Sequence, residues 1–196
     1  MSEKQSVPVK TDRRIIKTKA AIEDAFGRLL MQKDLSKITI SAIATEANIN
    51  RKTFYLHYSS VDDLFEDMVT RWIDGIIDDL REQHRQDPSK LNLANIATEL
   101  CIILHQDARE NAQIYAHIPL TRIFDLALAP VKNAIMDERV HQNQPEVENL
   151  EVYLRFVLAG AFSVYNHWLV TDSELSRDEI SSIIRDVTVH GIGKLV

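Results

Sequence analysis

The sequence predicts an all-α protein of about nine helices, and three observations support this fold class. Apolar residues recur at helical spacing along most of the chain, and no segment of any length alternates with the period of a strand. Only five glycines and five prolines interrupt 196 residues, as expected for long helices with short connections. Capping-box patterns begin at Ser60 and Ser176, each with an acidic residue three positions later.

Composition narrows the class of protein. Hydrophobic residues make up 45% and charged residues 27%, which is ordinary for a globular protein. The single cysteine, Cys101, excludes an intrachain disulfide and a cysteine-based metal cluster, and we predict neither a metal site nor a cofactor. The polar N-terminus has no apolar signal-peptide core, and no run approaches the roughly 18 apolar residues of a membrane span. We therefore expect a cytoplasmic protein without membrane contact.

The first helix is predicted over about residues 12–32, after a flexible basic arm at residues 1–11. Its expected buried stripe consists of Ile15, Ile22, Phe26, Leu29 and Leu30. Cations crowd the start of this helix, where the positive end of the helix dipole disfavours them. These candidate phosphate contacts are Lys10, Arg13, Arg14 and Lys17. A solvated charge cluster is the alternative interpretation.

Residues 38–57 carry the pattern of a helix-turn-helix. Thr39 can cap a short second helix, whose apolar positions include Ile43 and Ala44. Asn48 follows that helix and can adopt the left-handed conformation that a sharp turn needs. Asn50 then caps a third helix. This order of cap, helix, turn, cap and helix places a second helix in the major groove of DNA.

The third helix holds the candidate DNA contacts. Arg51 and Lys52 lie in its first turn, where acidic residues are usual, and the phosphate backbone would compensate their charge. Phe54 and Tyr58 are four residues apart and should anchor the helix to the core. The residues predicted to contact DNA are Thr39, Asn50, Arg51, Lys52, Thr53, Tyr55 and His57.

Charge is distributed unevenly along the chain. Residues 1–60 hold 11 Lys+Arg against 6 Asp+Glu, a net +5, whereas the remainder holds 12 against 23, a net −11. A basic head on an acidic body would orient the protein as it approaches an anion such as double-stranded DNA. Chance unevenness is the alternative.

The remainder of the chain, residues 60–196, is predicted to form the other helices. A long fourth helix should run from the capping box at Ser60 to about Gln86, and further helices are expected over about 92–105 and 111–118. We expect a break near Pro130, because proline removes a hydrogen bond from a helix interior. A helix over 146–170 and a last one from Ser176 to Gly191 complete the chain.

The sequence resembles the TetR family of bacterial transcription regulators over about residues 15–75. The resemblance rests on Thr39, Ile43-Ala44, Ala47, Thr53-Phe54-Tyr55-x-His57-Tyr58 and Asp63-Leu64. It implies that Thr39, Tyr55 and His57 contact DNA phosphates, while Arg51, Lys52 and Thr53 face the groove. Two positions depart from the family pattern. Asn48 replaces the usual glycine, and Val61 replaces a lysine that tends to contact phosphate.

The resemblance also implies a body that dimerises and often encloses a ligand. The expected dimer interface comprises Leu154, Leu158, Gly160, Ala161, Ile180, Ile184 and Val187, with packing inside one chain as the alternative. Candidate pocket residues are Trp72, Cys101, His105, Tyr115, His117, Phe124, Phe156, Tyr165 and Trp168, although aromatic residues at this spacing are more often core. No spacing of the two histidines indicates a metal site, and they are more typical of polar core or surface groups.

Together these features predict a homodimeric transcription regulator, a repressor that answers to a small-molecule effector and binds a near-palindromic operator. Its expected parts are the arm at 1–11, a three-helix head at 12–59 and a regulatory and dimerisation body at 60–196. We predict no enzyme, since the chain lacks a Gly-rich phosphate loop, a nucleophile elbow and an HExxH motif. The alternative is an all-α interaction module, or a TetR-like co-regulator controlled by a protein partner.

Overall fold

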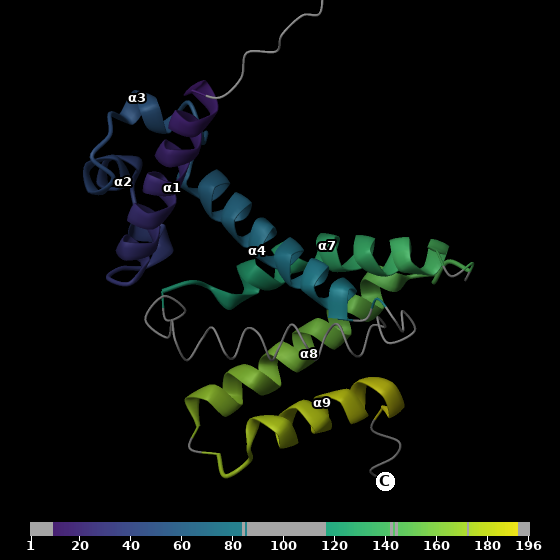
Figure 1. Cartoon of the computed structure of the whole chain (residues 1–196). Helices are drawn as coiled ribbons and strands as arrows, with labels where there is room; N and C mark the ends of the chain where they lie inside the picture. The colour runs from purple at the N-terminus through teal and green to yellow at the C-terminus, as the bar shows by residue number, and fades with distance from the viewer. Residues whose placement is uncertain are drawn as a thin grey trace, which may run out of the picture. The chain divides into compact units, whose positions relative to one another are not determined.

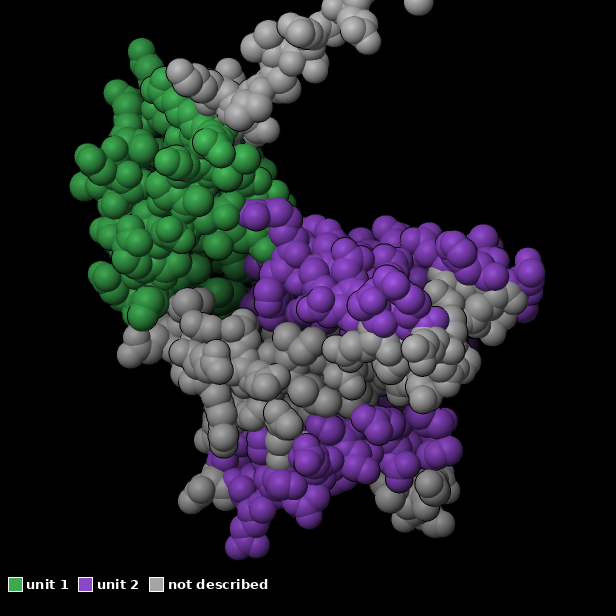
Figure 2. Space-filling model, viewed as in Figure 1, with its two compact units in different colours: residues 1–68, 116–118 green, residues 69–115, 119–196 purple. Residues whose placement is uncertain are grey.

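A computed structural model describes residues 10–83, 85, 117–141, 143, 145–171 and 173–191. Within these ranges the chain is all-helical, as predicted, with seven α-helices, one short 3-10 helix and no strand (Figure 1). The chain divides into two compact units (Figure 2). Unit 1 comprises residues 1–68 with 116–118, and unit 2 comprises 69–115 with 119–196.

Unit 1 contains the predicted helix-turn-helix. Its elements are α1 (Lys10–Leu30), the 3-10 helix η1 (Leu35–Lys37), α2 (Ile40–Glu46), α3 (Arg51–Phe54) and the first residues of α4 (Val61–Gln83). Helix α2 packs against both α1 and α3. The largest fully buried side chains of this unit are Ile22, Phe26, Ile43, Phe54, Leu64 and Phe65.

Local hydrogen bonds explain why these short elements begin and end where they do. The Thr39 hydroxyl oxygen accepts from the Ala42 amide at 3.2 Å, and the Asn50 carboxamide oxygen accepts from the Lys52 amide at 2.9 Å. Asn48 has a φ of 52°, the left-handed conformation that lets the chain turn sharply after α2. The predicted caps and turn are therefore confirmed.

Unit 2 is built on the rest of α4 with α7 (Leu120–His141), α8 (Leu150–Val170) and α9 (Arg177–His190). Side chains of α4, α7 and α8 form one apolar cluster: Ile73, Ile76, Ile77, Leu80, Ala127, Leu128, Val131, Ala134, Ile135, Leu150, Leu154 and Leu158. A smaller cluster of Ala161, Ile180 and Ile184 joins α8 to α9. None of the described helices is long and apolar enough to cross a bilayer.

The two predicted capping boxes, at Ser60 and Ser176, do not form to the same extent. At the start of α9, Ser176 and Glu179 exchange both hydrogen bonds, so the predicted box is confirmed. At the start of α4 only half of the box forms, because the Asp63 amide donates to the Ser60 hydroxyl at 2.9 Å while the Asp63 carboxylate accepts from Ser59 instead. Those bonds from Ser59 hold the pKa of Asp63 below its usual range.

Three sequence-based expectations are wrong. Helix α7 continues through Pro130, because side chains on both sides of the proline, including the fully buried Val131, are held in the core. Ile15 is 49% exposed, since the buried part of α1 begins only at Ile22. Helix α8 begins at Leu150 and not near 146, since Asn149 is left-handed with a φ of 58°. The helices expected over 92–105 and 111–118 lie outside the described residues, apart from 117–118, which are not helical.

Candidate nucleic-acid interface

Helix α3 is shorter than the sequence suggested. Its α-helical part is the single turn Arg51–Phe54, and the chain continues in tight turns through His57. A helix of one turn has almost no macrodipole, so the placement of Arg51 and Lys52 at its start says little about function. What matters at this site is which side chains are buried, which are exposed and which are paired.

Two aromatic residues fix α3 to the core of unit 1. Phe54 is fully buried and Tyr58 is 4% exposed, and their rings lie 5.9 Å apart at an angle of 46°. The Tyr58 hydroxyl contacts Glu23 Oε1 on α1 at 2.8 Å and Asp67 Oδ2 on α4 at 3.1 Å. Lys19 adds an ion pair to Asp67 at 3.0 Å. This network sets the orientation of α3 relative to the helices on either side of it.

Burial raises the pKa of Tyr58 well above its usual value, and the hydrogen bond to the Glu23 carboxylate raises it further. The phenol therefore stays protonated and acts as a hydrogen-bond donor between two acidic side chains. Its role at this site is structural, because its hydroxyl is turned towards α1 and α4 and its ring is buried.

The outer side of α3 carries the residues predicted to contact DNA. Arg51 and Lys52 are exposed, Tyr55 is 52% exposed, and Thr53 and His57 are half-buried. Thr39 and Asn50 are also exposed, and both already accept backbone amides through their side-chain oxygens. The structure thus brings all seven predicted residues together in unit 1.

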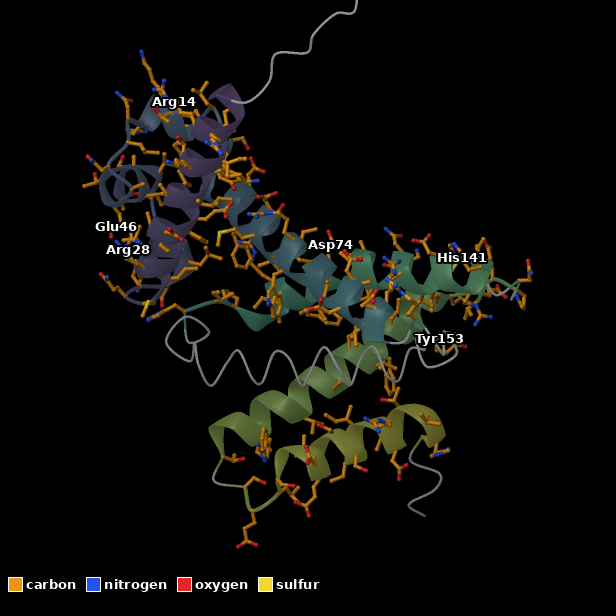
Figure 3. All side chains as sticks on the ribbon, viewed as in Figure 1. Arg14, Arg28, Glu46, Asp74, His141 and Tyr153 are labelled. Carbon is orange, nitrogen blue, oxygen red and sulfur yellow. The ribbon has the colours of Figure 1, made fainter. Side chains whose placement is uncertain are left out.

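The cations of unit 1 fall into two groups. Away from α3, Arg28 pairs with Glu46 at 2.6 Å and Lys37 pairs with Asp34 at 2.6 Å (Figure 3 shows the first pair). Among the described residues, neither Arg51 nor Lys52 has an acidic partner within ion-pairing distance. The positive charge beside α3 is therefore available to an anion from outside the chain.

A second basic feature adjoins the helix-turn-helix. An open hollow is lined by Arg13, Arg14, Lys17, Thr18, Ala21 and Ile49. Ile49 belongs to the turn just before α3, so the cations near the start of α1 (Figure 3 labels Arg14) lie next to that turn. The side chain of Lys10 lies outside the described residues.

The candidate pocket residues that the structure describes lie in different places. Trp72 and Phe124 pack against the cluster of α4, α7 and α8, whereas Trp168 packs against the α8–α9 cluster. Phe156 is 78% exposed, so it cannot line an interior pocket in this conformation, and that prediction is corrected. Cys101, His105, Tyr115 and the side chain of Tyr165 lie outside the described residues.

His117 is a half-buried polar group, which is the alternative to a pocket residue that the sequence offered. It lies in unit 1, where its Nδ1 is 2.9 Å from Asp34 Oδ1 and its carbonyl accepts from the Leu35 amide at 3.0 Å. Hydrogen bonds from Lys37 and His117 hold the pKa of Asp34 below its usual range, with Lys37 the larger cause. His117 is thus a tether to η1, and its described contacts are with the head.

The predicted dimer interface also needs correction. Leu154, Leu158, Ala161, Ile180 and Ile184 are between 0% and 5% exposed within the single chain, so they have no surface to offer a second copy. They form the intrachain packing that was the alternative interpretation. Gly160 and Val187 are exposed, and next to them lie Tyr153, Phe156 and Ile183. Helical spacing could not separate these two sets, because it marks apolar faces without saying what covers them.

One exposed residue in the turn after α3 was missed. Leu56, between Tyr55 and His57, is 82% exposed. Its position opposite the buried pair Phe54 and Tyr58 follows from helical spacing, so the sequence contained the signal.

Comparisons with known proteins agree with this geometry. Residues 23–68 match the family model described as bacterial regulatory proteins, tetR family. The uncharacterized HTH-type transcriptional regulator YxbF of Bacillus subtilis (strain 168) is 37% identical over 94 residues, which are 47% of this chain. The match covers 24% of YxbF, so the chain spans about a quarter of that relative's length.

Solved structures share the fold at low sequence identity. A TetR transcriptional regulator from Streptococcus agalactiae 2603V has a TM-score of 0.63 at 20% identity, covering 91% of this chain and 97% of that one. FadR from Bacillus subtilis in complex with stearoyl-CoA has a TM-score of 0.56 at 15% identity, covering 88% and 98%. The dihydroxyacetone kinase operon activator DhaS has a TM-score of 0.54 at 17% identity, covering 89% and 95%.

Proposed function

The chain belongs to the TetR family of bacterial transcription regulators, and from this premise we propose that it is a homodimeric, ligand-responsive repressor of a near-palindromic operator. The observation that carries the proposal is the exposed, unpaired pair Arg51 and Lys52 on a helix that is anchored by Phe54 and Tyr58. Exposed positive charge on a rigidly held element matches what the phosphate backbone requires.

In the proposed complex, α3 enters the major groove. Arg51, Lys52 and Thr53 face the base edges, where cationic and hydroxyl donors can read purines. Thr39, Tyr55 and His57 contact phosphates. The Thr39 oxygen caps α2, but its hydroxyl proton is still available to a phosphate oxygen. No described residue hydrogen-bonds the Tyr55 hydroxyl, so it too is available.

The hollow between α1 and the turn supplies further phosphate contacts. Arg13, Arg14 and Lys17 line it, and the described part of the chain contains no acidic partner for any of them. Each phosphate contact releases counterions and adds about 0.9 to the slope of log affinity against log salt. These three cations would offset the loss of the family lysine at the position of Val61.

The proposed dimer uses the exposed faces of α8 and α9. Phe156 is 78% exposed, Tyr153 57% and Ile183 45%, and Gly160 allows a second helix to approach closely. An exposed apolar set of this kind is typical of a protein–protein contact. Two-fold symmetry would then present two copies of α3 to two half-sites about one helical turn apart.

We test the dimer with Phe156→Asp, which places a charge on this face without disturbing the core, and with Thr121→Asp as an exposed control on α7. Light scattering should show a dimer for the wild type and the control, and a monomer for Phe156→Asp at micromolar concentration. A wild-type monomer would contradict the proposed interface.

The effector is proposed only as a small molecule that binds unit 2. FadR of Bacillus subtilis was solved in complex with stearoyl-CoA, so at least one chain of this fold binds a small molecule, and DhaS is described as an operon activator. A ligand can release the operator only by binding the DNA-free conformation more tightly than the DNA-bound one. Operator binding that strengthens with every ligand tested would contradict the repressor mechanism.

The decisive experiment is selection of bound DNA from a random pool with the full chain. The proposal predicts a near-palindrome with two equal half-sites. Enrichment of a single unrepeated half-site would refute the dimeric mode of binding. Absence of any enriched sequence, with no salt-dependent binding, would refute the DNA-binding function itself.

A further inference from the structure

Leu56 is the large apolar residue with the greatest exposure among those the structure describes, at 82%. In the sequence it stands between Tyr55 and His57, two of the proposed phosphate contacts, in the turn that follows α3. A single exposed leucine is ordinary on a protein surface, and what distinguishes Leu56 is its direction and its neighbours.

The direction follows from the backbone of this turn. The Tyr58 amide bonds the Phe54 carbonyl at 3.0 Å and the Leu56 amide bonds the Thr53 carbonyl at 3.2 Å, so residues 54–58 keep a helical path. Phe54 and Tyr58 both point into the core. Leu56 lies midway between them in sequence and therefore points to the opposite side, away from unit 1.

The neighbours on that outward side are polar. Lys52 lies four residues before Leu56, which places the two side chains on the same face of the helical path, and both are exposed. Among the described residues Lys52 has no acidic partner. The outermost part of the proposed recognition element is therefore one unpaired cation beside one apolar group.

The major groove offers one apolar group to match this arrangement. Every base edge presents hydrogen-bond donors or acceptors there, and only thymine adds a C5-methyl group. We propose that Leu56 is a specificity-determining residue that packs on the C5-methyl of one thymine in each half-site. This inference rests on the proposed function, because it assigns a base to a residue of the same interface.

Deoxyuridine provides a test that changes nothing but the methyl group. In the operator obtained by selection, each thymine of a half-site is replaced in turn by deoxyuridine, which keeps the base pair intact. Wild-type protein should lose affinity at one thymine per half-site by about fourfold, the factor expected for one methyl-sized contact at about 0.8 kcal/mol. Leu56→Ala should bind the thymine operator about fourfold more weakly for each half-site.

The critical measurement combines the substitution in the protein with the substitution in the DNA. With Leu56→Ala, replacing that same thymine by deoxyuridine should cause no further loss, because the methyl group has already lost its partner. Lys52→Ala serves as the matched control on the same face: it should weaken binding but retain the full sensitivity to the methyl group. Leu56 is exposed, so its substitution leaves the core intact, and circular dichroism checks this.

Two results would overturn the inference. One is an equal sensitivity of the wild type and Leu56→Ala at every thymine, and another is a selected half-site that contains no thymine. If either occurs while salt-dependent operator binding persists, the assignment of Leu56 fails and the proposed function stands. If no operator is selected and binding shows no salt dependence, the proposed function fails as well.

Discussion

Tyr58→Phe removes one hydroxyl group from the network that orients the recognition element. The ring remains, so its burial and its packing on Phe54 are kept. What is lost is the donor that contacts Glu23 at 2.8 Å and Asp67 at 3.1 Å. The variant therefore isolates the hydrogen bonds that join α1, the end of the helix-turn-helix and α4.

The magnitude follows from the surroundings of the two carboxylates. A hydrogen bond to a charged group contributes about 1.5–3 kcal/mol. Asp67 keeps its ion pair to Lys19, and its side chain is 33% exposed, so water can replace part of the loss. We expect Tyr58→Phe to lower the free energy of unfolding by about 1–2 kcal/mol, near the lower end of that range. For a chain of this size, each kcal/mol lowers Tm by about 2–4 °C.

Tyr55→Phe is the matched control. It makes the same chemical change three residues earlier in the chain. Tyr55 is 52% exposed, and no described residue hydrogen-bonds its hydroxyl. Thermal unfolding followed by circular dichroism should show no change for Tyr55→Phe and a lower Tm for Tyr58→Phe. Operator affinity should fall for Tyr55→Phe, because its hydroxyl is a proposed phosphate donor.

The pH dependence of stability is a second, independent test of the Tyr58 hydrogen bonds. The pKa of Tyr58 is raised by burial and by Glu23, so the group stabilises the fold fully below its usual value of about 10. Above that pH the unfolded state releases the proton first, and the stabilisation is lost. The difference in free energy of unfolding between wild type and Tyr58→Phe should therefore become smaller above pH 10. Equal stability of the two proteins at pH 7, or a stability difference unchanged up to pH 11, would contradict the role given to the Tyr58 hydroxyl.

Three further predictions concern other residues of unit 1. Val61→Lys restores a cation at the first residue of α4 and should steepen the salt dependence of operator binding by about 0.9 per protomer; an unchanged slope would contradict a phosphate contact there. Asn48→Val should cost about 1–2 kcal/mol in thermal unfolding, since a left-handed φ disfavours β-branched residues, whereas Asn48→Gly should be tolerated. His117→Ala should raise the pKa of Asp34 towards its usual value, and Lys37→Ala should raise it further, as read by NMR titration of the carboxyl; an unmoved pKa in both would disprove the tether. Because the pKa of Asp34 is lowered in the folded state, the stability it provides is lost only as pH falls below about 4.

The sequence could predict the helix-turn-helix because local chemistry determines it. Thr39 and Asn50 cap the residues two or three positions ahead of them, and Asn48 makes the turn by its own backbone conformation. Each of these features depends on near neighbours in the chain, so spacing alone reveals it. Local spacing locates the helix-turn-helix, and the family motif around Tyr55 and His57 then assigns DNA contacts to its side chains.

The parts that sequence could not predict depend on distant contacts. Helix α7 passes through Pro130 because Val131 and its neighbours are packed in the core, and local propensity is overridden. Leu154 belongs to the cluster of α4, α7 and α8, and Ile184 to the cluster of α8 and α9, both inside one chain. Periodicity cannot tell such intrachain packing from a dimer contact. The bridge from Tyr58 to Glu23 and Asp67 joins residues 35 and nine positions apart.

The proposed interface depends most on Arg51 and Lys52, whose unpaired charges would neutralise operator phosphates or face the groove beside them. The most direct measurement is operator affinity as a function of salt for wild type, for Arg51→Ala with Lys52→Ala, and for Lys132→Ala with Arg185→Ala as a control in unit 2. We expect weaker binding by the first pair of substitutions and a slope of log affinity against log salt that is shallower by up to about 1.8 per protomer, with the control unchanged. Equal affinity and equal slope for all three proteins, with the fold intact, would contradict it.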